Sequence, residues 1–194
     1  MNSSTQSFVL FSLGMILIIA NAAQAEESVT VSLGVDLKKP AGAFCAELAI
    51  KNVCESVTPH RATCMEVMRS NPKMQAAKSF VQLSKLVLKV AVYKATHGQK
   101  FLQELAKTNN CSAIQQCAGP NYDGVIRSFK SSLESIKEDA ASANYDAKVA
   151  ADDVHMCESH LADAKIVNPA ITQLNNEIKI MSAIAFTVGN NQNH

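Results

Sequence analysis

The sequence has no Trp and few residues that break helices. Of its 194 residues, seven are Gly and five are Pro, and most of these stand between segments that have a helical pattern. Ala, Lys, Ser, Leu and Val are plentiful instead. This composition predicts an all-α protein.

The chain also lacks an excess of either charge. It has 18 Lys and Arg against 17 Asp and Glu, so the formal net charge is only +1. Nucleic acids and anionic membranes select basic surfaces. The balance therefore argues against nucleic acid and membrane as partners.

The first 25 residues lack Lys, Arg, Asp and Glu altogether. Residues 8–20 form an apolar run, and Ala23-Gln24-Ala25 after it suits signal peptidase, which predicts a signal peptide cleaved after Ala25. A membrane anchor is the alternative, but the run of about 13 residues is shorter than the roughly 20 that a spanning helix needs. We therefore expect a secreted mature chain that folds as one domain.

The mature chain begins with a segment that has no helical pattern. Residues 26–43, which include the breaker Lys38-Lys39-Pro40-Ala41-Gly42, are expected to form a loose leader. In residues 44–70, two short helical stretches lie on either side of Thr58-Pro59, which predicts a helical hairpin.

Four longer amphipathic segments follow in residues 71–189. In chain order, these helices are expected to start at Asn71-Pro72, at Pro120 or Asp123, at about Tyr145 and at Asn168-Pro169, with Gly189 ending the last. The pattern leaves open whether the first helix ends at Gly98 or resumes through Leu105. Four helices joined by short loops predict an up-down-up-down four-helix bundle, with the hairpin as an N-terminal appendage and residues 190–194 as a tail.

Six cysteines allow fifteen complete pairings, and the expected order of the helices removes most of them. Cys54 and Cys64 flank the single turn of the hairpin. Cys117 is near the start of the second bundle helix and Cys157 is near the end of the third, which is the same end of two antiparallel neighbours. We therefore predict two disulfides, Cys54–Cys64 and Cys117–Cys157.

Cys45 and Cys111 are left over by this pairing. The first bundle helix, about 39 Å long for about 26 residues, separates them. Unless the hairpin folds back along the bundle, both thiols are expected to be free or to bind another molecule. Asn110-Cys111-Ser112 is also a formal glycosylation sequon, although a Cys in its middle weakens it.

The sequence contains no set of residues that predicts catalysis, a metal or a cofactor. His155, Glu158 and His160 form the best metal candidate, but the two histidines lie about 140° apart around a helix. Neighbouring carboxylates such as Asp152 and Asp153 diverge by about 100°, which does not suit an acid/base pair. Binding is therefore the leading class of function, and we do not expect an enzyme.

Two groups of side chains have an ordinary structural interpretation. The methionines are expected to fill gaps in the core, including Met65, Met68, Met156 and Met181. The lysines of the first bundle helix are expected to form a solvated face, namely Lys78, Lys85, Lys89 and Lys94.

One ordered set of motifs is more specific. Cys54-x3-Thr58-Pro59-x4-Cys64 is followed by Cys117 with Tyr122 soon after, by Cys157-Glu158, and by Asn168-Pro169 before the last helix. In this order, and together with the segments Asp139–Asp146 and Asp152–Glu158, these motifs resemble the plant pectin methylesterase and invertase inhibitor family. The resemblance covers about residues 44–189.

The resemblance implies a secreted protein of the plant cell wall, the apoplast or the vacuole. It also implies that the bundle caps the active-site cleft of one carbohydrate-active enzyme molecule. In that family the first and second cysteines and the third and fourth are bridged, which are the same two pairs. Inhibition of pectin methylesterase is the first hypothesis, inhibition of cell-wall or vacuolar invertase is the second, and a non-inhibitory structural protein is the third.

The sequence departs from the family pattern at three places. Tyr122 follows Cys117 by five residues rather than the usual four, and Gly119-Pro120 interrupts what is usually helix. Asp152 and Asp153 stand in place of a run of small residues and Thr. A Pro-Lys-Phe segment found in some invertase inhibitors is absent, which favours the methylesterase as target.

The expected target-binding residues lie on the second and third bundle helices and the loop between them. They are Lys137, Glu138, Asn144, Tyr145, Asp146 and Asp153. Tyr145 is the main anchor, because Tyr is common at protein interfaces. The alternative is that Asn144, Tyr145 and Asp146 only cap the third helix and solvate the loop.

Overall fold

The computed structural model describes residues 44–193, so the predicted signal peptide and leader lie outside the described residues. No strand occurs within 44–193. The α-helices are α1 (Ala46–Ser56), α2 (Arg61–Arg69), α3 (Pro72–Gln75), α4 (Phe80–Thr108), α5 (Ser112–Gln116), α6 (Tyr122–Ser135), α7 (Ala140–Asp163) and α8 (Pro169–Asn190). A π-helical turn at Cys117–Asn121 joins α5 to α6, and a 3-10 turn at Asn191–Asn193 follows α8.

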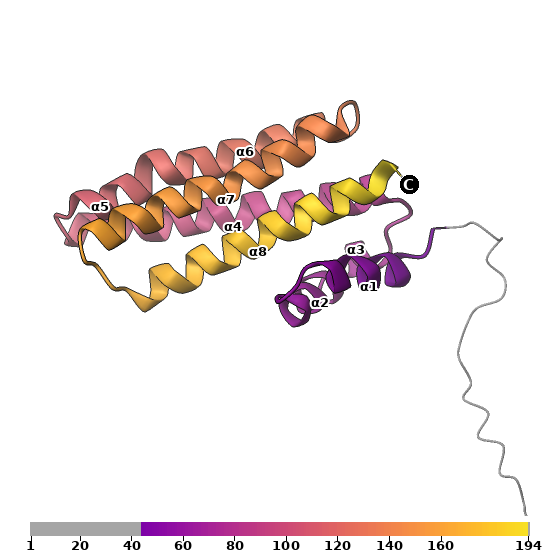
Figure 1. Cartoon of the computed structure of the whole chain (residues 1–194), viewed down its shortest axis with the longest axis horizontal. Helices are drawn as coiled ribbons and strands as arrows, with labels where there is room; N and C mark the ends of the chain where they lie inside the picture. Colours follow the sequence, from indigo (N-terminus) through magenta and orange to yellow (C-terminus); the bar gives the residue numbers. More distant parts are fainter. Residues whose placement is uncertain (1–43, 194) are drawn as a thin grey trace, which may run out of the picture. The chain divides into compact units, whose positions relative to one another are not determined.

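The four long helices α4, α6, α7 and α8 lie side by side as an up-down-up-down bundle, as predicted (Figure 1). They form a ring in which α4 packs against α6 and α8, and α7 packs against the same two helices. The helices α4 and α7 are therefore diagonal partners. Their outer faces lie on opposite sides of the bundle.

The first bundle helix begins later than predicted, and it continues past Gly98 through Leu105, which was one of the two alternatives for its end. Asn71 and Pro72 start only the single turn α3, where Asn71 Oδ1 accepts from the Lys73 N–H at 3.0 Å. The long helix α4 starts after Ser79, whose Oγ accepts from the Gln82 N–H at 3.1 Å. In return Gln82 Oε1 accepts from the Lys78 N–H at 2.8 Å. This exchange resembles a capping box, and it places the start of α4 at Phe80.

Gly98 lies inside α4 rather than at its end. A Cβ at this position would lie 2.5 Å from Leu174 Cδ1 of α8 and 3.2 Å from the Tyr122 ring. Gly98 therefore permits a close approach of α8 to α4. The helix continues past it to Thr108.

The second bundle helix has a distorted start, at the place where the sequence departs from the family spacing. The Tyr122 N–H donates to the Cys117 carbonyl oxygen, an i to i+5 bond, and Pro120 lies inside this π-turn. A π-turn accommodates one extra residue in a helix. Tyr122 consequently remains fully buried although it follows Cys117 by five residues.

The third bundle helix starts at Ala140, five residues before the predicted start. Asp139 is its N-cap and accepts from the Ser142 N–H at 3.0 Å and the Ser142 hydroxyl at 2.6 Å. These two hydrogen bonds hold the pKa of Asp139 below its ordinary value. Tyr145 therefore lies in the second turn of α7 and not at its cap.

The start of the last helix agrees with the prediction. Asn168 Oδ1 accepts from the N–H groups of Ala170 at 3.0 Å and Ile171 at 3.3 Å, and Pro169 occupies the first helical position. The helix ends at Asn190, one residue after the expected stop at Gly189. A side chain at position 189 would clash with Asn144 of α7, which explains why Gly is needed there. Beyond the helix, the Gln192 amide donates to Ser84 Oγ of α4 at 2.8 Å.

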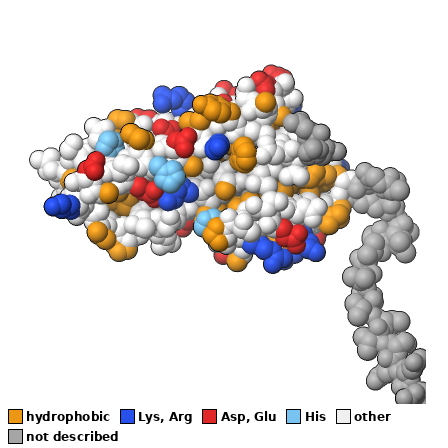
Figure 2. Space-filling model, viewed as in Figure 1, with side chains coloured by type: hydrophobic (Ala, Val, Ile, Leu, Met, Phe, Trp, Pro, Cys, Tyr) orange, Lys and Arg blue, Asp and Glu red, His pale blue; other side chains and the backbone are white. Residues whose placement is uncertain are grey.

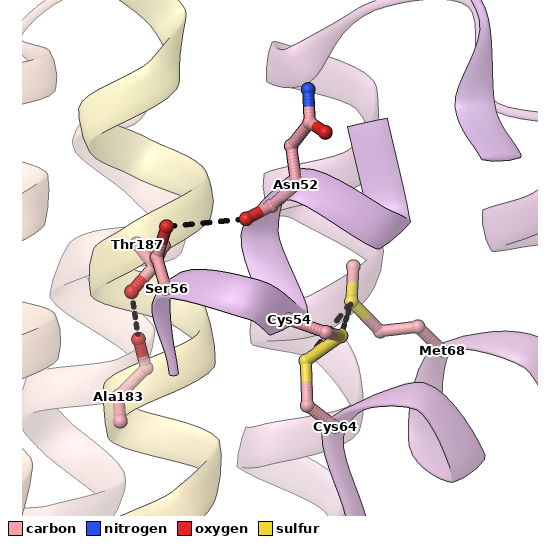
Figure 3. The surroundings of a disulfide bond; sticks show 7 residues. All are labelled: Asn52, Cys54, Ser56, Cys64, Met68, Ala183 and Thr187. Atoms are coloured by element: carbon pink, nitrogen blue, oxygen red, sulfur yellow. Dashed lines mark hydrogen bonds between the residues drawn. A yellow bond between two sulfur atoms is a disulfide. The ribbon is translucent and has the colours of Figure 1, made fainter. Parts of the chain in front are cut away.

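The N-terminal helices α1, α2 and α3 pack on one another and against α8 and α4. The Cys54–Cys64 disulfide joins α1 to α2, and Met68 Sδ lies 3.6 Å from Cys54 Sγ (Figure 3). Phe44 also meets Phe80 edge to face, with ring centroids 5.1 Å apart. The hairpin is thus closed on itself and anchored to the bundle.

The second disulfide, Cys117–Cys157, joins the π-turn to α7 in the core of the bundle. Both bridges match the pairs predicted from the order of the helices. Cys45 and Cys111 are unpaired, and Cys45 is exposed while Cys111 is half-buried. Within residues 44–193, no helix is both long and apolar enough to cross a membrane.

We predict that loss of either bridge destabilises the protein, and that the bridge closing the longer loop has the larger effect. The chain-entropy model gives a decrease in the free energy of unfolding of about 4 kcal/mol for Cys117→Ala/Cys157→Ala and about 3 kcal/mol for Cys54→Ala/Cys64→Ala. Urea titration followed by circular dichroism measures both values. The control variants Cys45→Ala and Cys111→Ala should leave the free energy of unfolding nearly unchanged.

Candidate functional site

The outer face of α7 exposes two large apolar side chains. Tyr145 is 69% exposed and Met156 is 53% exposed. The two residues are eleven positions apart, which is close to three helical turns, so they lie on the same side of the helix. Met156 is therefore not a core residue, and the prediction that it fills a core gap is wrong. Met68 and Met181 are buried as predicted.

The remaining candidate residues surround this pair on α7 and on the turn before it. Lys137 and Glu138 are exposed in the turn that joins α6 to α7. Asp146 and Asp153 are half-buried on the side of α7 that meets α6. We call Tyr145, Met156, Lys137, Glu138, Asp146 and Asp153 the α7 face.

Asn144 does not belong to this face, which corrects its assignment as a target-binding residue. It is only 7% exposed, and its side-chain amide donates to Asn190 Oδ1 of α8 at 2.8 Å. Its Oδ1 is buried against Gly189 without a hydrogen bond. Asn144 therefore holds α7 against the end of α8.

Two contacts with α6 fix the position of the α7 face. The Ser131 hydroxyl donates to Asp146 Oδ2 at 2.6 Å. Farther along α7, the Asp153 carboxylate lies over Gly124, where a Cβ would come within 2.5 Å of Asp153 Oδ2. A residue larger than Gly at position 124 would therefore displace Asp153.

The Asp153 carboxylate has an unusual electrostatic environment for a side chain near the surface. Burial raises the pKa of Asp153 above its ordinary value of 3.8, the positive charge of Arg127 opposes this shift, and the neighbouring Asp152 adds to it. The net direction shows that burial outweighs the attraction to Arg127. Asp153 is thus held at the α6–α7 contact at an electrostatic cost.

The back of the α7 face is a rigid part of the core. The Tyr122 hydroxyl of α6 donates to Asn175 Oδ1 of α8 at 2.8 Å, and Asn175 Nδ2 donates to Cys157 Sγ at 3.6 Å. Burial is the main reason that the pKa of Tyr122 is raised above its usual range. Together with the Cys117–Cys157 bridge, these bonds tie α6, α7 and α8 at one end.

The surface around the site contains charges of both signs. Figure 2, viewed as in Figure 1 with α7 and α8 toward the viewer, shows acidic, basic and His side chains interspersed with polar and apolar ones. His155 Nδ1 lies 3.1 Å from Glu158 Oε2, and Glu158 also accepts from Lys179 at 2.7 Å. In the described part of the chain, no three His, Cys, Asp or Glu side chains converge on a point that a metal ion would occupy.

This arrangement is suited to binding another protein. Exposed Tyr and Met on a rigid helix, surrounded by polar side chains, resemble the composition of a protein interface. The sequence pattern identified Tyr145 but missed Met156. The helical spacing of eleven residues between them was the available signal.

Comparisons with known proteins agree with this picture. A sequence model of the family described as plant invertase/pectin methylesterase inhibitor matches residues 48–188. The fold is similar to that of mutant form A of a pectin methylesterase inhibitor from Arabidopsis, with 18% identity, a TM-score of 0.64, and coverage of 73% of this chain and 95% of that one. A pectin methylesterase inhibitor from Arabidopsis thaliana gives 19% identity, a TM-score of 0.55, and coverage of 74% and 95%. No curated protein sequence matches the chain.

We predict that Asp153→Asn stabilises the protein at neutral pH. Because folding raises the pKa of Asp153, its ionised form opposes folding above the folded pKa, and this penalty disappears as the pH falls below 3.8. The Tm at pH 7 should therefore rise by about 1–2 °C, and the gain should vanish at pH 3. Thermal melts over this pH range test the prediction, with Glu134→Gln as an exposed control on α6; a gain that is equal at both pH values would contradict it.

Proposed function

Because the chain belongs to the plant invertase/pectin methylesterase inhibitor family, whose members are inhibitors and not enzymes, we propose that it inhibits a pectin methylesterase. The α7 face is the proposed contact surface. It would cover the active-site cleft of one enzyme molecule, so that the substrate polymer has no access. The protein supplies no chemical step of its own in this proposal.

The observation that carries the proposal is the exposure of Tyr145 and Met156 on one side of a rigid helix. A Tyr side chain gives a large contact area at low cost in conformational entropy, and Met adapts to irregular surfaces. The contacts of α7 with α6 and α8 hold these side chains in position before binding. Such preorganisation lowers the entropic cost of association.

Polar groups at the edge of the face are suited to orient the complex. Lys137 is an exposed ammonium group in the α6–α7 turn, where it would meet the carboxylates expected in an acidic catalytic cleft. Glu138 beside it and Asp146 on α7 carry the opposite charge. A surface that carries both positive and negative side chains favours a partner with a matching pattern of charges over any molecule of one charge sign.

One observation favours pectin methylesterase over invertase as the target. The α6–α7 turn lacks the Pro-Lys-Phe segment found in some invertase inhibitors. The similar solved structures are both described as pectin methylesterase inhibitors, but a likeness at 18% and 19% identity concerns the fold and does not bear on the target. An invertase of the cell wall or vacuole is the alternative target.

We also propose that the protein acts outside the cytosol. The two disulfides require an oxidising compartment, and residues 1–25 have the pattern of a signal peptide. The cell wall is the expected location and the vacuole is the alternative. Mass spectrometry of the protein secreted by plant cells would locate the cleavage site.

We predict that Tyr145→Ala raises the Kd of the complex with a pectin methylesterase about 30-fold, the effect of losing an anchor worth roughly 2 kcal/mol. Met156→Ala should have a smaller effect in the same direction. The matched control is Tyr93→Ala on the diagonal helix α4, because Tyr93 is also largely exposed. Inhibition of the purified enzyme at increasing inhibitor concentration gives the Kd values.

The same titration against an acid invertase tests the alternative target. Inhibition of the methylesterase with no effect on invertase supports the proposal, and the reverse result replaces it with the alternative. If neither enzyme is inhibited at micromolar excess and mildly acidic pH, the protein is a non-inhibitory member of the family. Equal loss of inhibition in Tyr145→Ala and Tyr93→Ala would argue against the α7 face as the contact surface.

A further inference from the structure

The outer face of α4 has a different character from the rest of the described surface. This helix carries five Lys and one Glu over its 29 residues. Two of the lysines are neutralised, because Lys94 pairs with Glu177 at 3.0 Å and Lys107 pairs with Glu104 at 2.6 Å. The other three, Lys85, Lys89 and Lys100, make no ion pair with any residue in 44–193.

These three lysines lie on one side of the helix. At 100° per residue, Lys85, Lys89 and Lys100 fall within about 60° of one another around the axis. The middle of the buried side, which includes Val87 and Ala91, points the other way. The distance along the helix from Lys85 to Lys100 is about 22 Å. The three ammonium groups therefore form an extended row along the helix and not a compact cluster.

Aromatic rings flank this row: at 100° per residue, Tyr93 lies about 20° from Lys100 around the axis, His97 about 60° and Phe101 about 100°. Tyr93 is 62% exposed, and its ring lies 3.9 Å from that of His97, measured between centroids. The Nδ1 atom of His97 is 2.9 Å from the Tyr93 carbonyl oxygen, which holds the imidazole in place. One turn later Phe101 is 40% exposed. We call Lys85, Lys89, Tyr93, His97, Lys100 and Phe101 the α4 stripe.

At one end of the stripe, positive groups crowd one another. Lys137 of the α6–α7 turn lies next to Lys85. Partial burial, and then the charges of Lys137 and Lys89, hold the pKa of Lys85 below its ordinary value, and only Glu138 opposes them. An anion placed across these ammonium groups would relieve their repulsion.

We propose that the α4 stripe binds de-esterified pectin, a linear polysaccharide with a carboxylate on its sugar units. The ammonium groups would pair with carboxylates along the polymer, and the exposed rings of Tyr93 and Phe101 would pack against the C–H faces of the sugars. A row about 22 Å long suits a polymer rather than a single sugar. The choice of this polymer rests on the proposed function, because it is the product of the enzyme that the protein is proposed to inhibit.

The bundle geometry allows both partners to bind at once. The helices α4 and α7 are diagonal in the ring, so the α4 stripe lies on the opposite side of the bundle from Tyr145 and Met156, and the two surfaces approach each other only where Lys137 lies beside Lys85. An enzyme molecule on Tyr145 and Met156 would leave Lys89 and Lys100 accessible. The inhibitor would therefore accumulate where methyl esters have already been removed, while it still blocks the enzyme.

Affinity electrophoresis of the disulfide-bonded protein in gels that contain polygalacturonate tests this inference. The natural protein should be retarded by polygalacturonate and much less by highly methyl-esterified pectin. Lys85→Gln/Lys89→Gln/Lys100→Gln should raise the apparent Kd about tenfold at low ionic strength, and Tyr93→Ala should raise it in the same direction. Retardation should also weaken as salt is added, because the charges are exposed.

The matched control is Lys51→Gln/Lys73→Gln/Lys165→Gln, which changes the net charge equally on other exposed surfaces. It should keep the affinity for polygalacturonate within about twofold, and both triple variants should keep full inhibition of the methylesterase. The inference would be overturned if polygalacturonate did not retard the protein, or if both triple variants lost the same affinity. It would also be overturned if esterified pectin or DNA bound the protein as tightly as polygalacturonate. Retardation that depends on the stripe without any enzyme inhibition would support the inference and contradict the proposed function.

Discussion

The buried bridge between Cys117 and Cys157 sets the register of α6 against α7, and the Tyr122–Asn175 hydrogen bond beside it adds α8 to the same junction. These bonds join three of the four bundle helices at one end. The orientation of α7, and so the direction of its exposed side chains, depends on them. The π-turn belongs to this junction, because it lets the helix absorb an extra residue while Tyr122 stays buried.

The ring arrangement gives the bundle two outer faces with different chemistry. The side of α7 that carries Tyr145 and Met156 has apolar groups with acidic and basic residues around them. The opposite side, on α4, has three lysines that form no ion pair with any residue in 44–193, together with three exposed rings. The balanced net charge of the chain conceals this division. The net charge describes only the average surface, so it does not reveal this local difference between the two faces.

Local signals predicted much of the fold, and they failed where two of them competed. Asn71-Pro72 and Asn168-Pro169 are the same start signal, but the first begins one turn and the second begins a full helix. The competing signal, Ser79-x-x-Gln82, begins α4 eight residues later. Gly is typical of helix ends, yet Gly98 and Gly189 both lie within helices. At each position a larger residue would clash with a neighbouring side chain, which explains why the residue is Gly. A glycine required for packing cannot be distinguished by local pattern from one that ends a helix.

The sequence by itself determined the all-α class, the order of the bundle helices, the two disulfides and the prominence of Tyr145. These features follow from helical periodicity, from capping residues and from the positions of cysteines in antiparallel neighbours, all of which are readable along the chain. Only the tertiary structure decided that Asn144 is buried against α8, that Met156 is exposed, and that three lysines of α4 make no ion pair within the described part of the chain. Burial and pairing depend on which surface covers each side chain, and that surface comes from residues far away in the sequence.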